Sequence, residues 1–209
     1  MLRIDGEARK LYEEIRQTEE ERNFTMVALE EVAYIITKGF AKLGMEVKVD
    51  MFGSTASDLA LRGSSDLDIC ITLPPEEAAR DPPNFNLLYE AIVLYIRHDP
   101  ASKSDLVTIE KELAFVATFG EILNIVVVSR TDPANKRDVG IVMNHSVNIP
   151  VRDLIKTYSH IDERCKILAC LLKQWCKVSF SKNNRMLVSH AVVLMTIAYL
   201  QHEGVLPRL

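Results

Sequence analysis

The sequence predicts an α+β protein, in which a mixed β-sheet flanked by helices is followed by a helical region. Two observations carry this prediction. In the first 150 residues, short segments alternate apolar and polar residues, which is typical of half-buried strands. After Pro150, apolar residues recur every three or four positions, which is typical of amphipathic helices. A chain of 209 residues with 48% hydrophobic content is also long enough to bury a substantial core.

The expected elements follow one another along the chain. Two helices open it, over 6–22 and 26–44, and the second ends at Gly44, a common C-terminal signal. The expected strands are 46–52 (EVKVDMF), 64–73 (SSDLDICITL), 122–130 (ILNIVVVSR) and 138–144 (DVGIVMN), the last antiparallel to the one before it. A helix is expected over 84–98, and the segment 106–120 fits either a helix or a strand. The helices expected in the C-terminal region are 152–159, 162–178 and 187–202.

Composition and charge restrict the classes of function. A net charge of −4 gives no overall field that attracts nucleic acid, so contact with RNA requires local basic patches. The four cysteines form no CxxC pair and are interpreted as small buried side chains in a reducing compartment. The N-terminal segment is charged and lacks the apolar stretch of a secretory signal, and no apolar run reaches the roughly 18 residues of a membrane span. We therefore expect a soluble intracellular protein, in the cytoplasm, with the nucleus and the mitochondrion left open.

The segment Asp66-Leu67-Asp68 carries the first candidate chemistry. Side chains alternate on a strand, so Asp66 and Asp68 point to one face and Leu67 to the other. Two neighbouring carboxylates repel each other unless a cation lies there, and Mg²⁺ prefers hard oxygen ligands. Asp138 begins a later strand and can join the pair if the two strands are adjacent; three carboxylates can then hold two metal ions. The alternative is a solvated strand face, which is the commoner setting for such a pair.

A glycine-serine pair stands just upstream of these aspartates. Gly53 and Ser54 end one expected strand, twelve residues before Asp66, and a short helical stretch is expected from there to Leu61. Glycine allows the backbone to approach a ligand closely, and free N–H groups at a helix start can bind phosphate. The sequence thus brings candidate phosphate donors and candidate metal ligands together.

Three segments of the chain match motifs of one superfamily in the same order. They are MFGSTASDLALRGSSDLDICITL, KTYSHIDERCKILACLLKQWCKVSF and MLVSHAVVLMTIAYLQHEGVLP. The first resembles the signature of the DNA polymerase β nucleotidyltransferase superfamily, and more closely that of the noncanonical poly(A) polymerases and terminal uridylyltransferases. The second is similar to their Tyr…Asp-x-Arg…Lys-x-Trp-x-Lys helix, and the third to their Tyr-Leu-Gln…Leu-Pro segment. The resemblance covers most of residues 26–207 and implies a nucleotidyltransferase fold followed by the first helices of a poly(A)-polymerase-like central domain.

The resemblance also implies an activity and a set of site residues. The implied reaction is template-independent addition of UMP or AMP, from UTP or ATP, to an RNA 3′ end with Mg²⁺ or Mn²⁺. Asp66, Asp68 and Asp138 are the implied metal ligands and catalytic residues, with Asp138 accepting the proton of the attacking 3′-hydroxyl. The implied nucleotide-binding residues are Gly53, Ser54, Ser65, Lys173, Lys177, Ser189 and His190.

The two lysines have independent support from their spacing. Lys173 and Lys177 are one helical turn apart and share a helix face with Lys166. The buried side of that helix is expected to consist of Ile167, Leu168, Leu171, Leu172 and Trp175. A solvated lysine stripe without a ligand is the alternative, and Trp175 is interpreted as a core residue rather than a platform for base stacking.

At three points the sequence departs from the family pattern. His190 stands where the family has an aromatic residue that stacks on the nucleobase, so base binding is expected to be weaker or differently selected. Val151 stands where the family has an asparagine that contacts the sugar. Family members continue beyond the Leu-Pro motif, whereas this sequence ends at Leu209. We therefore expect a truncated helical domain, which is either a fragment of a longer protein or completed by a part from elsewhere. Its exposed apolar face predicts poor solubility or a binding partner that covers it.

The expected organisation is N-terminal helices over 1–45, a catalytic domain over 46–150 and the start of a helical central domain over 151–209. Three other functions stay open. The first is a catalytically silent nucleotidyltransferase-like scaffold in an RNA-processing complex. The second is a transferase that acts on a small molecule or a protein hydroxyl. The third is a non-enzymatic helical interaction module.

Overall fold

The chain folds into two compact units that alternate along the sequence. The computed structural model describes residues 6–63, 66–78, 107–113, 122–129, 131–144, 147–180 and 188–208. The first unit comprises residues 1–18, 53–65 and 150–209, and the second comprises residues 19–52 and 66–149. The units thus differ from the three consecutive ranges expected from the sequence, because the two N-terminal helices belong to different units. The expected helix over 84–98 lies outside the described residues.

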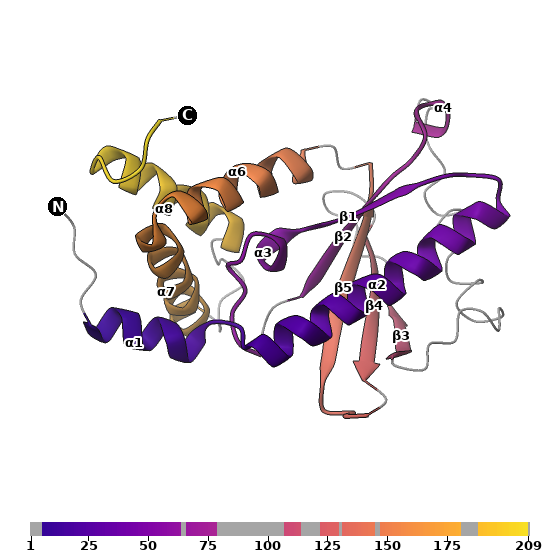
Figure 1. Cartoon of the computed structure of the whole chain (residues 1–209), viewed down its shortest axis with the longest axis horizontal. Coiled ribbons are helices and arrows are strands. Elements are labelled where there is room, and N and C mark those ends of the chain that lie inside the picture. Colours follow the sequence, from indigo (N-terminus) through magenta and orange to yellow (C-terminus); the bar gives the residue numbers. More distant parts are fainter. Residues whose placement is uncertain are drawn as a thin grey trace. The chain divides into compact units, whose positions relative to one another are not determined.

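The second unit is built on a five-stranded mixed sheet (Figure 1). Its strands are β1 (Lys48–Phe52), β2 (Leu67–Thr72), β3 (Val107–Leu113), β4 (Ile122–Ser129) and β5 (Lys136–Met143), in the spatial order β1-β2-β5-β4-β3. β2 and β5 are parallel, whereas the other neighbouring strands are antiparallel. The expected mixed sheet is thereby confirmed, and the ambiguous segment 106–120 contains a strand. A short helix, α4 (Pro75–Ala78), follows β2.

The long helix α2 (Glu19–Lys42) runs across one face of this sheet (Figure 1). Its apolar stripe packs against the alternate residues Leu67, Ile69 and Ile71 of β2, all of which are fully buried. The other buried members of this core are Ala28, Val32, Ile36, Phe40, Leu73, Ile125, Val127, Val139, Ile141 and Met143. The expected alternation of β2 is therefore correct, and it leaves the aspartates of that strand on the face away from α2.

The break between the first two helices was predicted at the wrong place. α1 (Gly6–Ile15) ends before Arg16, not near residue 22. The chain there forms long-range backbone hydrogen bonds: Gln17 N donates to Ala60 O at 3.1 Å, and Arg62 N donates to Ile15 O at 2.8 Å. The first turn of α2 contains three glutamates, which the positive end of the helix dipole favours. A pairing with a segment some 45 residues away leaves no local signal in the sequence.

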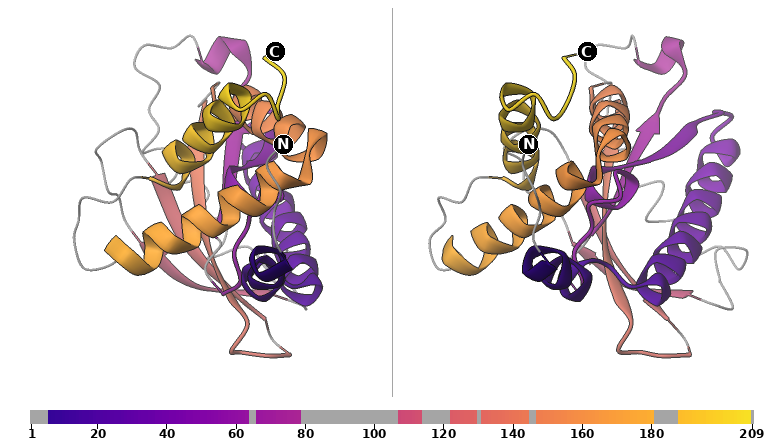
Figure 2. Two further views of the ribbon diagram at one scale, coloured as in Figure 1. Left: turned by 90° about the vertical axis from the view of Figure 1, so that its left-hand side faces the viewer. Right: turned by 60° about the vertical axis from the view of Figure 1, so that its left-hand side comes forward.

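The first unit consists mainly of helices (Figure 2). They are α1, α3 (Gly53–Ala56), α6 (Asn148–Ile161), α7 (Glu163–Phe180) and α8 (Ser189–His202). α7 packs against both α1 and α8. The buried residues of this core are Leu59, Leu61, Ile155, Tyr158, Cys165, Ala169, Cys170, Val193, Ile197, Leu200 and Leu206. The three helices expected after Pro150 are thus present with slightly different bounds.

Two further expectations about side chains and helices can be compared with the structure. Cys70, Cys165, Cys170 and Cys176 are all buried, as predicted, and none of them forms a disulfide. Burial raises the pKa of Cys165 and of Cys170 to about 11, so both thiols are protonated at neutral pH. Every helix in the described part of the chain is too short or too polar to cross a bilayer.

Candidate active site

Two of the aspartates predicted as metal ligands, Asp68 and Asp138, lie on neighbouring parallel strands of the second unit, and Asp66 directly precedes the strand of Asp68. Leu67 of β2 is paired with Val139 of β5, and both side chains are fully buried on the α2 side of the sheet. Asp66 and Asp138 each directly precede one of these paired residues, and Asp68 follows Leu67. Because side chains alternate along a strand, Asp66, Asp68 and Asp138 share the opposite face of the sheet. The adjacency that the prediction required is therefore present.

The donor chemistry of this face suits a hard cation. Carboxylate oxygens are the ligands that Mg²⁺ takes from proteins. Asp66 and Asp138 are exposed and Asp68 is half-buried, so solvent reaches the face. Within the described residues, no three Asp, Glu, His or Cys side chains converge closely enough to hold one metal ion. Three like charges repel one another. The backbone register thus suits a metal, whereas the carboxylate groups do not converge.

Gly53 opens the first unit's short helix α3 with a backbone conformation that favours glycine. Its φ is +73°, in the left-handed region where a Cβ atom causes steric strain. The Gly53 carbonyl accepts hydrogen bonds from the backbone N–H and the hydroxyl of Ser57, and the Ser54 carbonyl accepts one from Leu59 N at 2.9 Å. Glycine is therefore required here by the turn itself, and phosphate binding by Gly53 and Ser54 stays a prediction. Ser65 lies outside the described residues.

The two candidate lysines of α7 differ in their surroundings. The Lys173 side chain is buried, with a residue exposure of 7%, and its ammonium donates a hydrogen bond to the Leu59 carbonyl at 2.6 Å. Lys177 is exposed, and Lys166 is half-buried. The expected lysine face is therefore wrong for Lys173, which shares the buried stripe with Cys165, Ala169 and Cys176. Ala169, Lys173 and Cys176 follow Cys165 by four, eight and eleven positions, a spacing that places all four residues on one face of the helix.

Trp175 is exposed, contrary to the expected core position. Its exposure is 57%, and its ring makes an edge-to-face contact with Phe180 at a centroid distance of 5.4 Å. Leu168, Leu171 and Leu172 are only half-buried. Of the predicted apolar side, Ile167 is buried and Leu168 packs partly buried against the core, whereas Trp175 is exposed; the rest of the buried stripe consists of small residues and Lys173.

Ser189 and His190 form the start of α8 and are both exposed. The residue before the helix is Val188, which provides no side-chain cap. A hydroxyl and an imidazole are therefore accessible to solvent at this helix start, and their predicted role in nucleotide binding stays a prediction. The preceding motif residues 185–187 lie outside the described residues.

Other residues of the matched motifs prove to hold the first unit together. The Gln201 side chain donates hydrogen bonds to the Tyr158 hydroxyl at 2.7 Å and to the Pro207 carbonyl at 2.9 Å. It thereby joins α6 to the turn that follows α8. Leu200 and Leu206 are buried in the same core. The motif positions Tyr158, Gln201 and Pro207 thus have a structural role that spacing alone did not indicate.

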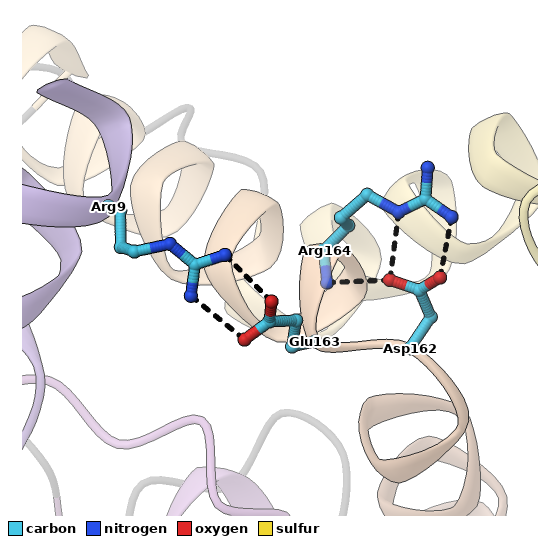
Figure 3. A network of polar contacts seen from close by, with 4 residues as sticks. All are labelled: Arg9, Asp162, Glu163 and Arg164. Carbon is cyan, nitrogen blue, oxygen red and sulfur yellow. Dashed lines mark hydrogen bonds and ion pairs between the residues drawn. The ribbon is translucent and has the colours of Figure 1, made fainter. Parts of the chain in front are cut away.

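Two arginine–carboxylate pairs lie at the start of α7 (Figure 3). Asp162 accepts hydrogen bonds from the backbone N–H of Arg164 and from its guanidinium, at 2.6 to 2.9 Å, and so caps the start of α7. Arg9 of α1 binds both carboxylate oxygens of Glu163, at 2.7 and 2.9 Å. The hydrogen bond from Arg164 lowers the pKa of Asp162, and that from Arg9 lowers the pKa of Glu163.

The architecture is that of a nucleotidyltransferase, with a mixed sheet whose parallel neighbours carry the candidate carboxylates. The model of the family described as poly(A) RNA polymerase, mitochondrial-like, central palm domain matches residues 4–160. This chain belongs to that family.

Similar proteins include poly(A) and poly(U) polymerases. Poly(A) RNA polymerase gld-2 homolog A of Drosophila melanogaster is 26% identical over 202 residues, which make up 92% of this chain and 13% of that protein. A chain of the GLD-2/RNP-8 complex has a TM-score of 0.75 at 19% identity, and the match covers 96% of this chain and 63% of that one. The Cid1 poly(U) polymerase with bound MgGTP has a TM-score of 0.71 at 22% identity, with 96% of this chain and 56% of that one covered. This chain therefore spans only part of the length of each relative.

Proposed function

We propose that this chain carries the catalytic centre of a template-independent RNA 3′-end nucleotidyltransferase, which adds UMP or AMP from UTP or ATP. The observation that carries the proposal is the parallel register of β2 and β5, in which Asp66, Asp68 and Asp138 share one face near the start of both strands. Membership in a poly(A) polymerase family supports the reaction class. The names of the relatives support both nucleotides, since one is a poly(A) polymerase and another a poly(U) polymerase.

In the proposed reaction, the 3′-oxygen of the RNA attacks the α-phosphorus of the nucleotide. The bond between that phosphorus and the bridging oxygen to the β-phosphate breaks, and pyrophosphate leaves. Asp138 accepts the proton of the 3′-hydroxyl. Asp66, Asp68 and Asp138 are the residues that would hold Mg²⁺ or Mn²⁺, which when bound stabilises the charge that develops on the attacking and leaving oxygens.

The other proposed site residues bind the nucleotide. Gly53, Ser54 and Ser65 are proposed to contact the triphosphate through N–H and hydroxyl donors. Lys177 is exposed and has the charge to bind phosphate, and Lys173 is proposed to join it. Ser189 and His190 are proposed to contact phosphate and base at the start of α8.

One observation favours a second candidate, a silent nucleotidyltransferase-like scaffold. The ammonium of Lys173 is buried and donates a hydrogen bond to the Leu59 carbonyl, a packing role that a scaffold would need as much as an enzyme. An enzyme also needs Lys173 or Lys177 to bind a phosphate, whereas a scaffold does not.

Extension of a labelled RNA with each of the four nucleotides, in Mg²⁺ or Mn²⁺, separates the two candidates. We expect extension with UTP or ATP, and a loss of about a thousandfold or more in Asp138→Asn, because metal ligands contribute several kcal/mol to such reactions. The matched control is Asp132→Asn, an exposed aspartate in the turn before β5, which should keep full activity. Extension that survives Asp138→Asn would refute the proposed site, and no extension at all would favour the scaffold.

A protein partner for the helical unit is also proposed. Leu194, Met195 and Tyr199 of α8 are exposed large apolar side chains. One of the similar structures is the GLD-2/RNP-8 complex, which supports a partner of this kind. A monodisperse monomer in light scattering would count against it.

A further inference from the structure

Arg137 is a buried cation on the strand that carries Asp138. It precedes Asp138 in β5, and its residue exposure is 8%. Because neighbouring strand residues point to opposite faces, the Arg137 side chain lies on the α2 side of the sheet, away from the candidate metal ligands. A buried charge is costly unless hydrogen bonds and an opposite charge compensate for it, so its contacts indicate what it does.

The contacts of the guanidinium lead to the first turns of α2. Nε donates a hydrogen bond to the Thr25 hydroxyl at 3.1 Å, and a terminal nitrogen donates to the Glu21 carbonyl at 3.5 Å. The Glu21 carboxylate lies 3.9 Å from the same group, and the Phe24 ring centroid lies 5.8 Å from it. Another nitrogen donates to the Lys136 carbonyl at 3.0 Å. The positive charge of Arg137 is therefore well compensated, mostly by residues in the first turns of α2.

This anchor acts at the start of β5. Among the described residues, the register of β2 with β5 runs from Leu67 and Val139 onward, just past Arg137 and Asp138. On the other side, Asp138 and Arg137 pair with Val126 and Val127 of β4. The contact of Arg137 with α2 thus holds the start of β5 from the α2 side, in addition to its pairing with β4.

We propose that Arg137 is a positioning residue for Asp138. Arg137 fixes the first residues of β5 to α2. It thereby sets the position of the Asp138 backbone relative to Asp66 and Asp68. It touches no substrate and acts only through the backbone of its neighbour. The inference rests on the proposed function, since it takes Asp138 as a metal ligand and catalytic base.

The test compares two threonines of α2. Thr25 and Thr37 each donate a hydroxyl hydrogen bond to the carbonyl four residues earlier, both at 2.7 Å, but only Thr25 accepts one from Arg137. Thr25→Val therefore removes the anchor's acceptor while preserving shape, and Thr37→Val controls for the loss of the shared bond. Arg137→Met removes all the guanidinium contacts and should have the larger effect. If Arg137→Met does not fold, Thr25→Val still tests the proposal.

Two readouts on the full chain are needed. Mn²⁺ affinity, measured by electron paramagnetic resonance of the free ion, should fall about tenfold in Thr25→Val and more in Arg137→Met, as is usual when the support of a ligand is lost. Hydrogen exchange should become faster at residues 136–139 and stay unchanged at residues 141–143. Thr37→Val should resemble the parent chain in both readouts.

The outcomes separate the inference from the proposed function. If Asp138→Asn weakens Mn²⁺ binding while Thr25→Val and Arg137→Met keep the parental affinity, the positioning role is refuted and the metal site stands. Equal losses of Mn²⁺ affinity in Thr25→Val and Thr37→Val would also refute the positioning role. The cause would then be the loss of the hydrogen bond within α2 that both threonines make. If Asp138→Asn binds Mn²⁺ like the parent, the proposed site is wrong and the inference falls with it.

Discussion

A lysine ammonium that is removed from water needs a partner, and Lys173 finds one in the carbonyl of Leu59, which belongs to the segment that follows Gly53 and Ser54. Lys173 therefore links α7 to the chain just beyond α3, whatever it does for a nucleotide. Lys177, one turn further along α7, is exposed and makes no comparable contribution to packing. The two residues share one predicted role but differ in what the fold requires of them.

We predict that Lys173→Met lowers the free energy of unfolding by about 1–3 kcal/mol, because the Leu59 carbonyl loses a buried charged donor. Lys177→Met should change it by less than about 0.5 kcal/mol, as is usual for a surface substitution. Urea unfolding of both variants and the parent measures the difference. Equal, small effects would show that the Lys173 contact contributes little to stability.

At this scale the sequence predicted the strand face of the aspartates but not the burial of Lys173. The alternation of Asp66 and Asp68 with apolar neighbours is local, so a strand pattern suffices to assign their face. The surroundings of Lys173 depend on a carbonyl 114 positions away in the sequence, and no local pattern reports such a partner.

Among the elements, α2 has a clearly defined C-terminal end. Gly44 has a φ of +75°, its N–H donates to Ala41 O at 3.0 Å, and the N–H of Met45 donates to Phe40 O at 3.0 Å. This nested pair of bonds is the Schellman motif, which usually requires glycine at that position. The predicted stop at Gly44 is confirmed.

Gly44→Ala should lower the free energy of unfolding by about 1 kcal/mol, because a Cβ atom disfavours the left-handed conformation. Apart from Gly44 itself and its two chain neighbours, no atom of the described residues lies within 4 Å of the site of that Cβ, so the cost comes from the backbone conformation. Gly6→Ala, at the start of α1, is the matched control and should cost nothing, since Gly6 does not have a positive φ. Chemical denaturation checks both, and a Gly44→Ala variant as stable as the parent contradicts the assignment.

Elements whose type depends on distant partners were harder to predict. β3 became a strand by pairing with β4, although its sequence VTIEKEL fits a helix as well. The end of α1 is likewise fixed by bonds to residues 60 and 62. By contrast, β4 and β5 were predicted correctly, because a turn and two apolar runs lie next to each other in the sequence.

On the scale of the whole molecule, the alternation of the two units along the chain was not predictable. It arises because α2 supplies the cover of the sheet while α1 packs on α7. Both contacts are long-range, and both helices are amphipathic, so the sequence alone gives no reason to separate them. The prediction of a sheet followed by helices was nevertheless correct for the class of fold.

The helical unit should lose stability in acid. Asp162 has a lowered pKa in the folded chain, so its ion pair stabilises the fold above the ordinary aspartate value of about 3.9, and this contribution disappears as the pH falls through the folded value. Asp162→Asn keeps the helix cap but removes the charge. The difference in unfolding free energy between parent and variant should be constant from pH 7 to about 5 and shrink below about pH 4. A difference that does not depend on pH would show that the pair contributes no charge-dependent stability.

The central claim is that Asp66, Asp68 and Asp138 form one metal site, and Mn²⁺ binding to the full chain tests it most directly. Electron paramagnetic resonance titration should show binding by the parent and its loss in each of Asp66→Asn, Asp68→Asn and Asp138→Asn. Asp50→Asn is the matched control, because Asp50 belongs to the adjacent strand β1 and its carboxylate is already paired with Lys48 at 2.8 Å. We expect this control variant to bind Mn²⁺ with the affinity of the parent chain. Mn²⁺ binding that is unchanged in the three aspartate variants, or that is lost equally in Asp50→Asn, would contradict the central claim.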